Sequence, residues 1–302
     1  MGLTGFLQPM KSCSANPVIE RAQPWLGTIV RIRVEGLPSG QAHNAIDAAF
    51  AEVATVQRLM SFHEPGSDIS RLNRDGSSRR VDVHPYTLDV LREALAISAS
   101  TNGCFDISVG AELVAWDMLP HPAGESPVPD GCWRNIEICS DSHVRFHRPV
   151  WIDVGGIAKG YAVDKAIGCL RESGARRAVV NAGGDIRVLG EETEQIRLAP
   201  DFPVDSVPIL QLADGSVASS SRQSRQDPVR GPHIHGITRS PAPPDRFVSV
   251  VAERCVIADA LTKVVMAEGE SAFETLEQFE ACAHFHDPLT GWRHLGGGAE
   301  SQ

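Results

Sequence analysis

The chain has 302 residues, of which 42% are hydrophobic and 22% charged, a composition typical of globular proteins and unlike that of disordered or collagen-like chains. Its 28 basic and 38 acidic residues give a net charge of −10, and a surface of that sign repels phosphate backbones, which argues against nucleic-acid binding. The seven cysteines are scattered without a C-x-x-C pair, which favours reduced thiols over a zinc ribbon or a disulfide framework. No run approaches the ~18 apolar residues of a membrane span.

The N-terminal segment carries none of the features of an export signal. Residues 1–14 contain one short apolar patch with no basic region before it, and Cys13 lacks the apolar run that precedes a lipoprotein cysteine. We therefore expect a cytoplasmic protein.

Hydrophobic periodicity predicts the elements along the chain. Residues 28–34 alternate with period two, as in a strand, and residues 42–59 show helical spacing. A polar, turn-rich stretch follows at 61–73, and Pro85 begins a second helix over 85–100. Four prolines and two glycines make residues 119–134 a surface excursion.

The second half of the chain continues with short strands and three helices. Strands are expected at residues 136–140, 143–146, 151–154, 177–181, 186–189, 196–199, 207–212 and 247–252, and helices at residues 158–172, 257–268 and 271–279. Residues 219–244, rich in Ser, Arg, Pro and His, are expected to form a long loop or lid. Because strands and helices mix without strict alternation, the pattern favours an α+β fold, with mixed sheets and flanking helices, over a doubly wound sheet.

Residues 152–164 read I-D-V-G-G-I-A-K-G-Y-A-V-D, a strand, a glycine turn and the start of a helix. This arrangement aims backbone N–H groups at an anion, and Gly155 and Gly156 allow a ligand close to the backbone. Asp153 adds an acceptor and Lys159 a cation. A purely structural glycine turn is the alternative, and the segment lacks the G-x-x-x-x-G-K-[ST] pattern of a nucleotide P-loop.

The same segment resembles the D-[LV]-G-G-I-A-K-G-Y-A-x-D signature of the ApbE family, the FAD:protein FMN transferases. Other stretches resemble motifs of that family in the same order: 25–28 (W-L-G-T), 60–62 (M-S-F), 68–73 (D-I-S-R-L-N), 105–110 (F-D-I-S-V-G), 180–185 (V-N-A-G-G-D), 219–220 (S-S, where A-T-S-G is usual) and 258–261 (A-D-A-L). Together they cover about residues 25–270, which makes the resemblance specific.

The resemblance implies one α+β domain with a flavin cleft between two lobes. We expect residues 1–24 to be an N-terminal extension, residues 25–292 to form the domain and residues 293–302 to be a disordered tail. It also implies FAD as substrate, Mg²⁺ as activating metal, and transfer of FMN to a Ser or Thr hydroxyl of an acceptor protein with release of AMP. Many members of the family are exported, which bears on the expected location.

Carried over residue by residue, the metal ligands implied are the backbone carbonyl of Gly156 and the carboxylate of Asp259. The family places a Ser/Thr pair three and four positions after this aspartate, whereas this chain has Thr262 and then Lys263. A lysine ammonium cannot ligate Mg²⁺ and competes with it. Either Thr262 turns to the metal, or Lys263 reaches the pyrophosphate and partly replaces the cation. A solvated helix lysine and a helix-capping Asp259 are the structural alternatives.

The resemblance also implies flavin contacts and a base. The flavin contacts correspond to Leu26, Phe62, Cys104, Phe105, Asp106, Asp153, Lys159 and Ile234. His233 corresponds to the family's proposed base, although the Asp-Pro turn that usually follows is absent, and an ordinary loop histidine is the alternative. The H-x-H pairs at 233–235 and 284–286 leave zinc as a minor option without further ligands in register.

Two other functions remain open at this point. Water in place of the acceptor hydroxyl would make the protein an FAD pyrophosphatase that forms FMN and AMP. Lys263 and the missing Asp-Pro turn also allow a flavin-binding protein without turnover.

Overall fold

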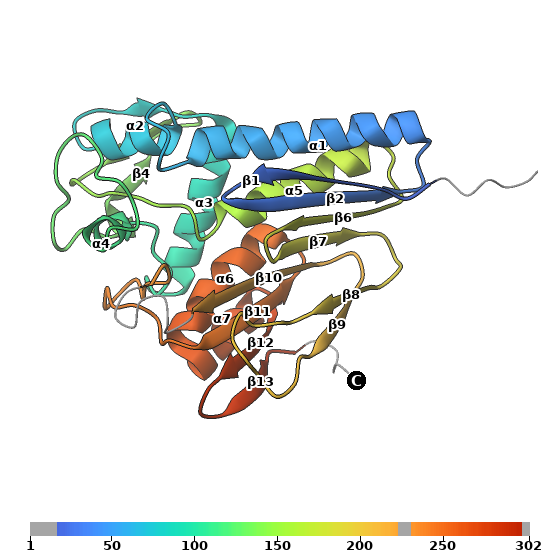
Figure 1. Ribbon diagram of the computed structural model, residues 1–302. Helices are drawn as coiled ribbons and strands as arrows, with labels where there is room; N and C mark the ends of the chain where they lie inside the picture. The colour runs from blue at the N-terminus through green and yellow to red at the C-terminus, as the bar shows by residue number, and fades with distance from the viewer. Residues whose placement is uncertain (1–16, 223–230, 298–302) are drawn as a thin grey trace, which may run out of the picture.

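In a computed structural model, which describes residues 17–222 and 231–297, the chain forms one large antiparallel sheet with helices packed on it (Figure 1). The strand order is β1-β2-β6-β7-β10-β11-β12-β13. These strands are β1 (Ile19–Trp25), β2 (Thr28–Glu35), β6 (Arg177–Ala182), β7 (Asp185–Leu189), β10 (Ser216–Arg222), β11 (Arg246–Ala252), β12 (Cys282–Asp287) and β13 (Gly291–Leu295). All strand pairs among the described residues are antiparallel, so the α+β class is confirmed.

Seven α-helices and two small sheets complete the described part of the chain. The helices are α1 (Ser39–Met60), α2 (Asp68–Asp75), α3 (Pro85–Ser100), α4 (Gly110–Ala115), α5 (Ala158–Glu172), α6 (Cys255–Glu268) and α7 (Phe273–Gln278), with 3₁₀ turns at Trp133–Asn135 and Gly269–Ala272. The small sheets are β3-β5-β4, from β3 (Val81–Asp82), β4 (Ile136–Ile138) and β5 (His143–Phe146), and the hairpin of β8 (Glu194–Arg197) with β9 (Ile209–Leu212).

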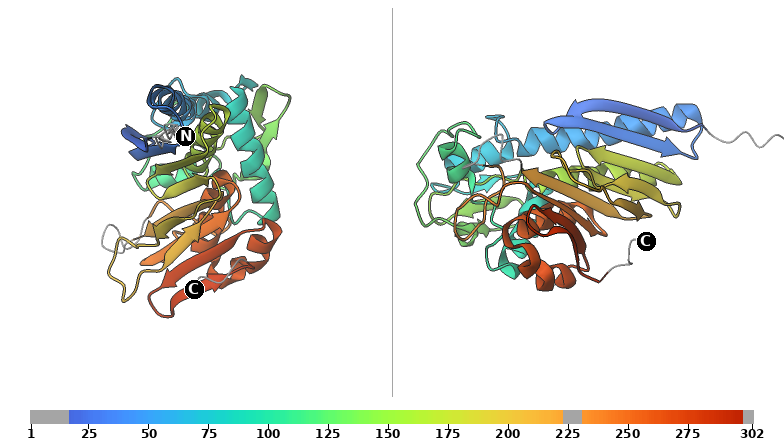
Figure 2. Two further views of the ribbon diagram at one scale, coloured as in Figure 1. Left: turned by 90° about the vertical axis from the view of Figure 1, so that its right-hand side faces the viewer. Right: turned by 60° about the horizontal axis from the view of Figure 1, so that its bottom comes forward.

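Helices α1, α5 and α6 lie next to one another and cover the large sheet (Figures 1 and 2). Their apolar residues recur at helical spacing, so each helix buries one stripe against the strands. Val30, Ile32 and Val34 of β2 alternate inward and are fully buried against α1 and α5. The helix predicted over 42–59 is α1, extended at both ends, and α5 has the bounds predicted for it.

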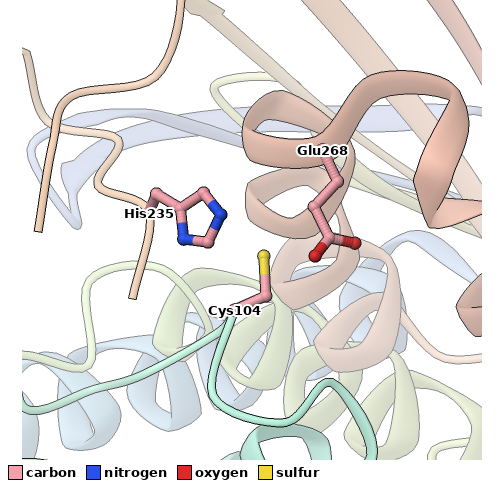
Figure 3. A group of neighbouring side chains, drawn as sticks. All are labelled: Cys104, His235 and Glu268. Atoms are coloured by element: carbon pink, nitrogen blue, oxygen red, sulfur yellow. The ribbon is translucent and has the colours of Figure 1, made fainter. Parts of the chain in front are cut away.

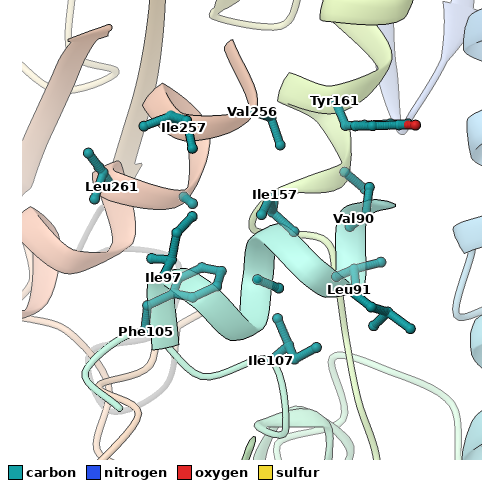
Figure 4. Close-up of a cluster of buried hydrophobic side chains, with 14 of the residues drawn as sticks. Val90, Leu91, Ile97, Phe105, Ile107, Ile157, Tyr161, Val256, Ile257 and Leu261 are labelled. Carbon is teal, nitrogen blue, oxygen red and sulfur yellow. The ribbon is translucent and has the colours of Figure 1, made fainter. Parts of the chain in front are cut away.

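A second helical layer is built around α3. Figure 4 shows Leu91 and Ile97 of α3 near Tyr161 of α5 and Leu261 of α6. Ile157, just before α5, and Phe105 and Ile107, from the segment after α3, belong to the same cluster. This cluster continues into α2 and the β3-β5-β4 sheet. The segment 104–107 is therefore held against both α5 and α6, which matters for the site described below.

Three sequence predictions need correction. The turn-rich stretch 61–73 contains α2, which starts at Asp68 because the Ser67 side chain accepts a hydrogen bond from the Ser70 amide. The expected loop 219–244 begins inside β10, and residues 223–230 lie outside the described residues. The expected strand 151–154 is a buried extended segment that joins no sheet.

The ends of the chain also differ from expectation in part. Residues 19–24 of the expected extension belong to β1, which pairs with β2 along its whole length. Residues 293–295 of the expected tail belong to β13, which pairs with β12. Residues 1–16 and 298–302 lie outside the described residues. Within the part of the chain that the structure describes, no helix has both the length and the apolar composition needed to cross a membrane.

His284 on β12 makes the folded state sensitive to acid. Burial, with a smaller contribution from His294, lowers the pKa of His284 to about 4, whereas an unfolded histidine titrates near ~6.5. As the pH falls, the unfolded chain therefore binds a proton at this histidine before the folded chain does. The contribution of neutral His284 to the free energy of unfolding is complete above about pH 6.5 and is lost as the pH falls from there toward 4.

We expect the free energy of unfolding to drop by about 1–2 kcal/mol more between pH 7 and pH 5 in the wild type than in His284→Gln, whose side chain does not titrate. Urea denaturation at both pH values measures the difference. Equal pH dependence in the two proteins would show that His284 can protonate in the folded state.

Candidate active site

The segment that precedes α5 is held in an extended conformation by side-chain and loop contacts. The Asn73 side chain donates to the Ile152 carbonyl (2.9 Å) and accepts from the Ile152 amide (2.7 Å). The Asp153 amide donates to the carbonyl of Ile107 (2.8 Å), and the amide of Gly110 donates to the carbonyl of Trp151 (3.0 Å). These bonds use the backbone groups that a sheet would need, which explains why residues 151–154 are not a strand and fixes where the glycine turn emerges.

Helices α5 and α6 are fastened to each other at their N-terminal ends. Both carboxylate oxygens of Asp164 accept hydrogen bonds from α6, from the amides of Cys255 and Val256 (2.9 Å each). The amide of Gly160 in α5 donates to Asp259 Oδ2 in α6 (3.0 Å). A Cβ at Gly160 would lie 2.2 Å from the Cys255 carbonyl oxygen, so only glycine permits this approach. The motif residues 152–164 therefore position the carboxylate of Asp259.

Two lysines and two aspartates meet where β7, α5 and α6 converge. Lys159 forms an ion pair with Asp185 and lies 3.9 Å from Asp259 Oδ1. Lys263 Nζ is 2.5 Å from the same Asp259 oxygen. Both carboxylates are buried, while the two lysine side chains are partly exposed. The two ammonium groups thus balance the charge of the two carboxylates. Because only the lysine side chains reach solvent, the exposed side of this group is positively charged.

The charges in this group set each other's pKa. Burial by itself would lower the pKa of Lys159, but the carboxylates of Asp259 and Asp185 outweigh burial and raise it. Burial would raise the pKa of Asp259, but the ammonium groups of Lys159 and Lys263 hold it below its ordinary value. Burial, together with repulsion from Asp259, raises the pKa of Asp185 to about 6. All these shifts leave Lys159 protonated and Asp259 ionised at neutral pH.

The oxygens expected to hold a metal are already arranged around the ammonium of Lys263. Its Nζ donates to Asp259 Oδ1 and lies 3.0 Å from Thr262 Oγ1, 3.2 Å from Ser220 Oγ and 3.2 Å from the Asp259 carbonyl. Thr262 donates to the Asp259 carbonyl (2.7 Å), so the Ser220 hydroxyl donates to Thr262 (2.8 Å). A Cβ at Gly156 would meet Lys263 Cε at 3.3 Å.

This arrangement does not fit a bound Mg²⁺. The ion needs oxygens at ~2.1 Å in octahedral order, whereas here a cationic nitrogen stands among them. Asp259 Oδ2 already accepts the Gly160 amide, and Oδ1 is shared by two lysines. The residues expected as metal ligands are brought together, but around an ammonium group.

A cavity of about 750 Å³ opens over this group. Of the residues implied by sequence, those that line it are Leu26, Phe62, Phe105, Asp106, Asp153, Gly156, Lys159, His233, Ile234 and Lys263. Cys104, Asp259 and Thr262 lie behind the lining and are buried. The lining thus combines apolar and aromatic surface with two cations.

His233 enters this cavity with one ring nitrogen unused. Its Nε2 lies 3.3 Å from the carbonyl oxygen of Ser221, which can only accept, so Nε2 carries the proton. Nδ1 is then a free acceptor, and it is buried without a hydrogen-bond partner among the described residues. Burial, reinforced by the charge of Lys263, lowers the pKa of His233 to about 3, so the ring is neutral at physiological pH.

The loop that carries His233 is fastened by residues that the sequence analysis did not single out. The Gly236 amide donates to the Cys104 carbonyl (2.8 Å), and a Cβ at Gly236 would lie 2.2 Å from the Gly103 carbonyl oxygen. Arg239 donates to Asp106 Oδ2 (2.9 Å). Asp106, expected to contact the flavin, therefore uses this carboxylate oxygen to hold the loop. The packing of Gly236 and the positive φ of Arg239 gave no recognisable sequence signal.

Cys104, His235 and Glu268 form a second polar cluster beside the cavity (Figure 3). Their possible ligand atoms lie within 4.8 Å of one another. Burial, and then the nearby Glu268 carboxylate, raise the pKa of the Cys104 thiol, which keeps it protonated. His233 and His235 therefore belong to different surroundings and do not act as a pair. The sequence analysis also did not single out Asp185 and Ser220, which contact Lys159 and Lys263. Both residues lie in the motif stretches 180–185 and 219–220.

Comparisons with known proteins agree with the fold. A sequence model described as the ApbE family matches residues 26–285. The curated FAD:protein FMN transferase of Vibrio cholerae is 28% identical over 271 residues, which are 82% of this chain and 80% of that protein. The one from Treponema pallidum is 26% identical over 295 residues, with coverage of 86% and 81%.

Solved structures show the same fold. The flavin transferase ApbE from Vibrio cholerae has a TM-score of 0.78 at 24% identity, covering 92% of this chain and 97% of that one. The ApbE protein from Thermotoga maritima has a TM-score of 0.79 at 24% identity, with the same coverage.

Gly160→Ala tests the contact between α5 and α6. The new methyl group must push α6 away, so we expect the free energy of unfolding to fall by about 2–3 kcal/mol. Gly168→Ala in the same helix is the matched control, because a Cβ there meets nothing within 4 Å. It should leave stability unchanged or raise it by up to ~1 kcal/mol. Denaturant unfolding measures both, and equal effects would refute the assigned contact.

Proposed function

Because the chain belongs to the ApbE family, we propose that it is an FAD:protein FMN transferase, the activity in the names of its curated relatives. In the proposed reaction, FMN moves from FAD to a Ser or Thr hydroxyl of an acceptor protein, and AMP leaves. The acceptor and FAD are the proposed partners.

The observation that carries the proposal is a single cavity that offers apolar surface, two cations and an unprotonated base. FAD has a flat, largely apolar ring system and an anionic diphosphate. Phe62 and Phe105 offer surface for the ring, and Lys159 and Lys263 offer positive charge for the diphosphate. An acidic protein needs such a local cation to attract an anion against its own field.

The proposed transfer is one displacement at phosphorus. The acceptor oxygen forms a bond to the FMN phosphorus, and the bond from that phosphorus to the bridging oxygen breaks. The electron pair leaves with AMP, and the hydroxyl proton goes to Nδ1 of His233. His233 is the candidate base because its Nδ1 has no hydrogen-bond partner, and in the protein without FAD its pKa of about 3 makes it a weak base. The diphosphate's negative charge, when bound nearby, raises the basicity of the ring.

Mg²⁺ is the metal that the resemblance implies, and as a Lewis acid it would polarise the phosphate that is attacked. The oxygens of Asp259 and Thr262 are the ligands it would use, together with the carbonyl of Gly156. Because the oxygens of Asp259 and Thr262 surround the Lys263 ammonium, we derive no step through a metal ion.

The reaction is tested by incubating the full chain with FAD and a pool of random peptides that each contain one Ser or Thr. Mass spectrometry should find peptides heavier by an FMN group, with one AMP released for each. FMN and AMP without labelled peptide would instead identify an FAD pyrophosphatase. FAD that binds with no AMP formed, with or without added Mg²⁺, would identify a flavin-binding protein.

His233→Asn tests the base. The amide cannot take the proton, so we expect AMP release to slow by about 10²–10⁴-fold. The dissociation constant of FAD, followed by quenching of flavin fluorescence, should change little. Wild-type turnover in this variant would remove His233 from the mechanism, and loss of FAD binding would assign it a structural role.

A further inference from the structure

We propose that the ammonium group of Lys263 takes the place of a divalent cation in this chain, so that FMN transfer proceeds without Mg²⁺. The inference rests on the proposed function and concerns the same site. It names the group that supplies positive charge to the diphosphate and makes this enzyme independent of metal.

The first support is the location of the nitrogen. Lys263 Nζ has four oxygens within 3.2 Å, from Asp259, Thr262 and Ser220. An ion bound to Asp259 Oδ1 and Thr262 Oγ1 would need the space that this nitrogen fills. The three hydrogens of an ammonium group suit several acceptors at hydrogen-bond distance. The site therefore has a cation already, supplied by the chain itself.

The second support is access. Asp259 is 0% exposed and cannot touch a ligand in the cavity, so its negative charge acts through a cation that lies between. Lys263 lines the cavity, and its side chain is 16% exposed. Its stem passes over Gly156, where a Cβ would meet Cε at 3.3 Å. The absence of a side chain at Gly156 gives the lysine its path from α6 to the cavity.

The third support is charge balance. Lys159 and Lys263 offset Asp185 and Asp259 in the buried group. In the absence of FAD, a divalent ion added to it would leave two uncompensated positive charges and would stand close to an ammonium. Movement of Lys263 out of the cluster would in turn remove its hydrogen bonds to Thr262 and Ser220. Binding of the ion is therefore disfavoured whether it binds beside Lys263 or displaces it.

In the transfer step, Lys263 acts on the phosphate oxygens through its positive charge, because its three hydrogens already face four acceptors in the protein. As the bridging P–O bond breaks, negative charge grows on the phosphate of the departing AMP, and a fixed ammonium stabilises that charge. No electron transfer is involved. Lys159, paired with Asp185 and Asp259, supplies a second positive charge at the same side of the cavity.

The experiment compares metal dependence in matched variants of the full chain. Protein is passed over chelating resin, and AMP release from FAD is measured in EDTA and in millimolar Mg²⁺. The wild type should show the same rate within about two-fold in both. Lys263→Met, which keeps the stem and loses the charge, should be slower by about 10²-fold or more in both conditions and should bind FAD more weakly.

Lys263→Thr should convert the site to a metal-dependent one. Its hydroxyl lies one helical turn after Asp259, and loss of the ammonium frees the oxygens of Asp259, Thr262 and Ser220. We expect it to be inactive in EDTA and active with Mg²⁺. Mg²⁺ should raise its melting temperature and leave that of the wild type unchanged, a measurement that needs no turnover.

Lys165→Met is the control for loss of a lysine. This residue lies on α5 away from the cavity, with Nζ 4.3 Å from the centre of the Tyr86 ring. It should leave the rate, FAD affinity and metal response unchanged. A wild type that stops in EDTA and recovers with Mg²⁺ overturns the inference. So does a wild type inactive under both conditions when Lys263→Thr is active with Mg²⁺, although the proposed function then stands. If no variant forms AMP under any condition, the proposed function fails and the inference fails with it.

Discussion

The ion pairs among Lys159, Lys263, Asp185 and Asp259 are the constraint around which the site is built. Burial of two carboxylates is unfavourable in free energy unless cations and hydrogen-bond donors lie next to them. The fold provides the cations from α5 and α6, and the Gly160 amide of α5 donates a hydrogen bond to Asp259. Because each lysine also faces the cavity, the same contacts that allow the carboxylates to be buried present positive charge to an anionic ligand.

The rest of the architecture serves to hold these elements in register. Asp164 caps α6, Gly160 lets α5 and α6 approach each other, and Asn73 holds the extended segment that leads into α5. Arg239 and Gly236 fasten the loop that carries His233. The signature segment 152–164 therefore positions backbone through Gly160 and Asp164, and it also contributes Asp153, Gly156 and Lys159 to the cavity lining.

The sequence predicted well those elements that carry a strong local pattern. Helix α3 has the predicted bounds because capping and periodicity agree in it, and α5 has them from its periodicity without a side-chain cap. The prediction failed where tertiary contacts override the pattern. The apolar run 151–154 reads as a strand, but Asn73 and Ile107 occupy its backbone groups. β10 is rich in serine and reads as a loop, yet its serines are satisfied by neighbours, as Ser219 is by Ser249 (2.7 Å).

The sequence by itself determined the family resemblance, the α+β class and which residue types gather in the cavity, because motifs and periodicity are local properties. It left open whether Thr262 or Lys263 serves the cation site, since a side chain's direction depends on its neighbours in space. Only the tertiary structure placed the Lys263 ammonium beside Asp259, opened a path for its stem over Gly156 and left Nδ1 of His233 unpaired. The path over Gly156 depends on a contact between segments more than a hundred residues apart, which no local pattern encodes. The pairing of Lys263 with Asp259, four residues away on α6, depends on which neighbours surround the two side chains in space.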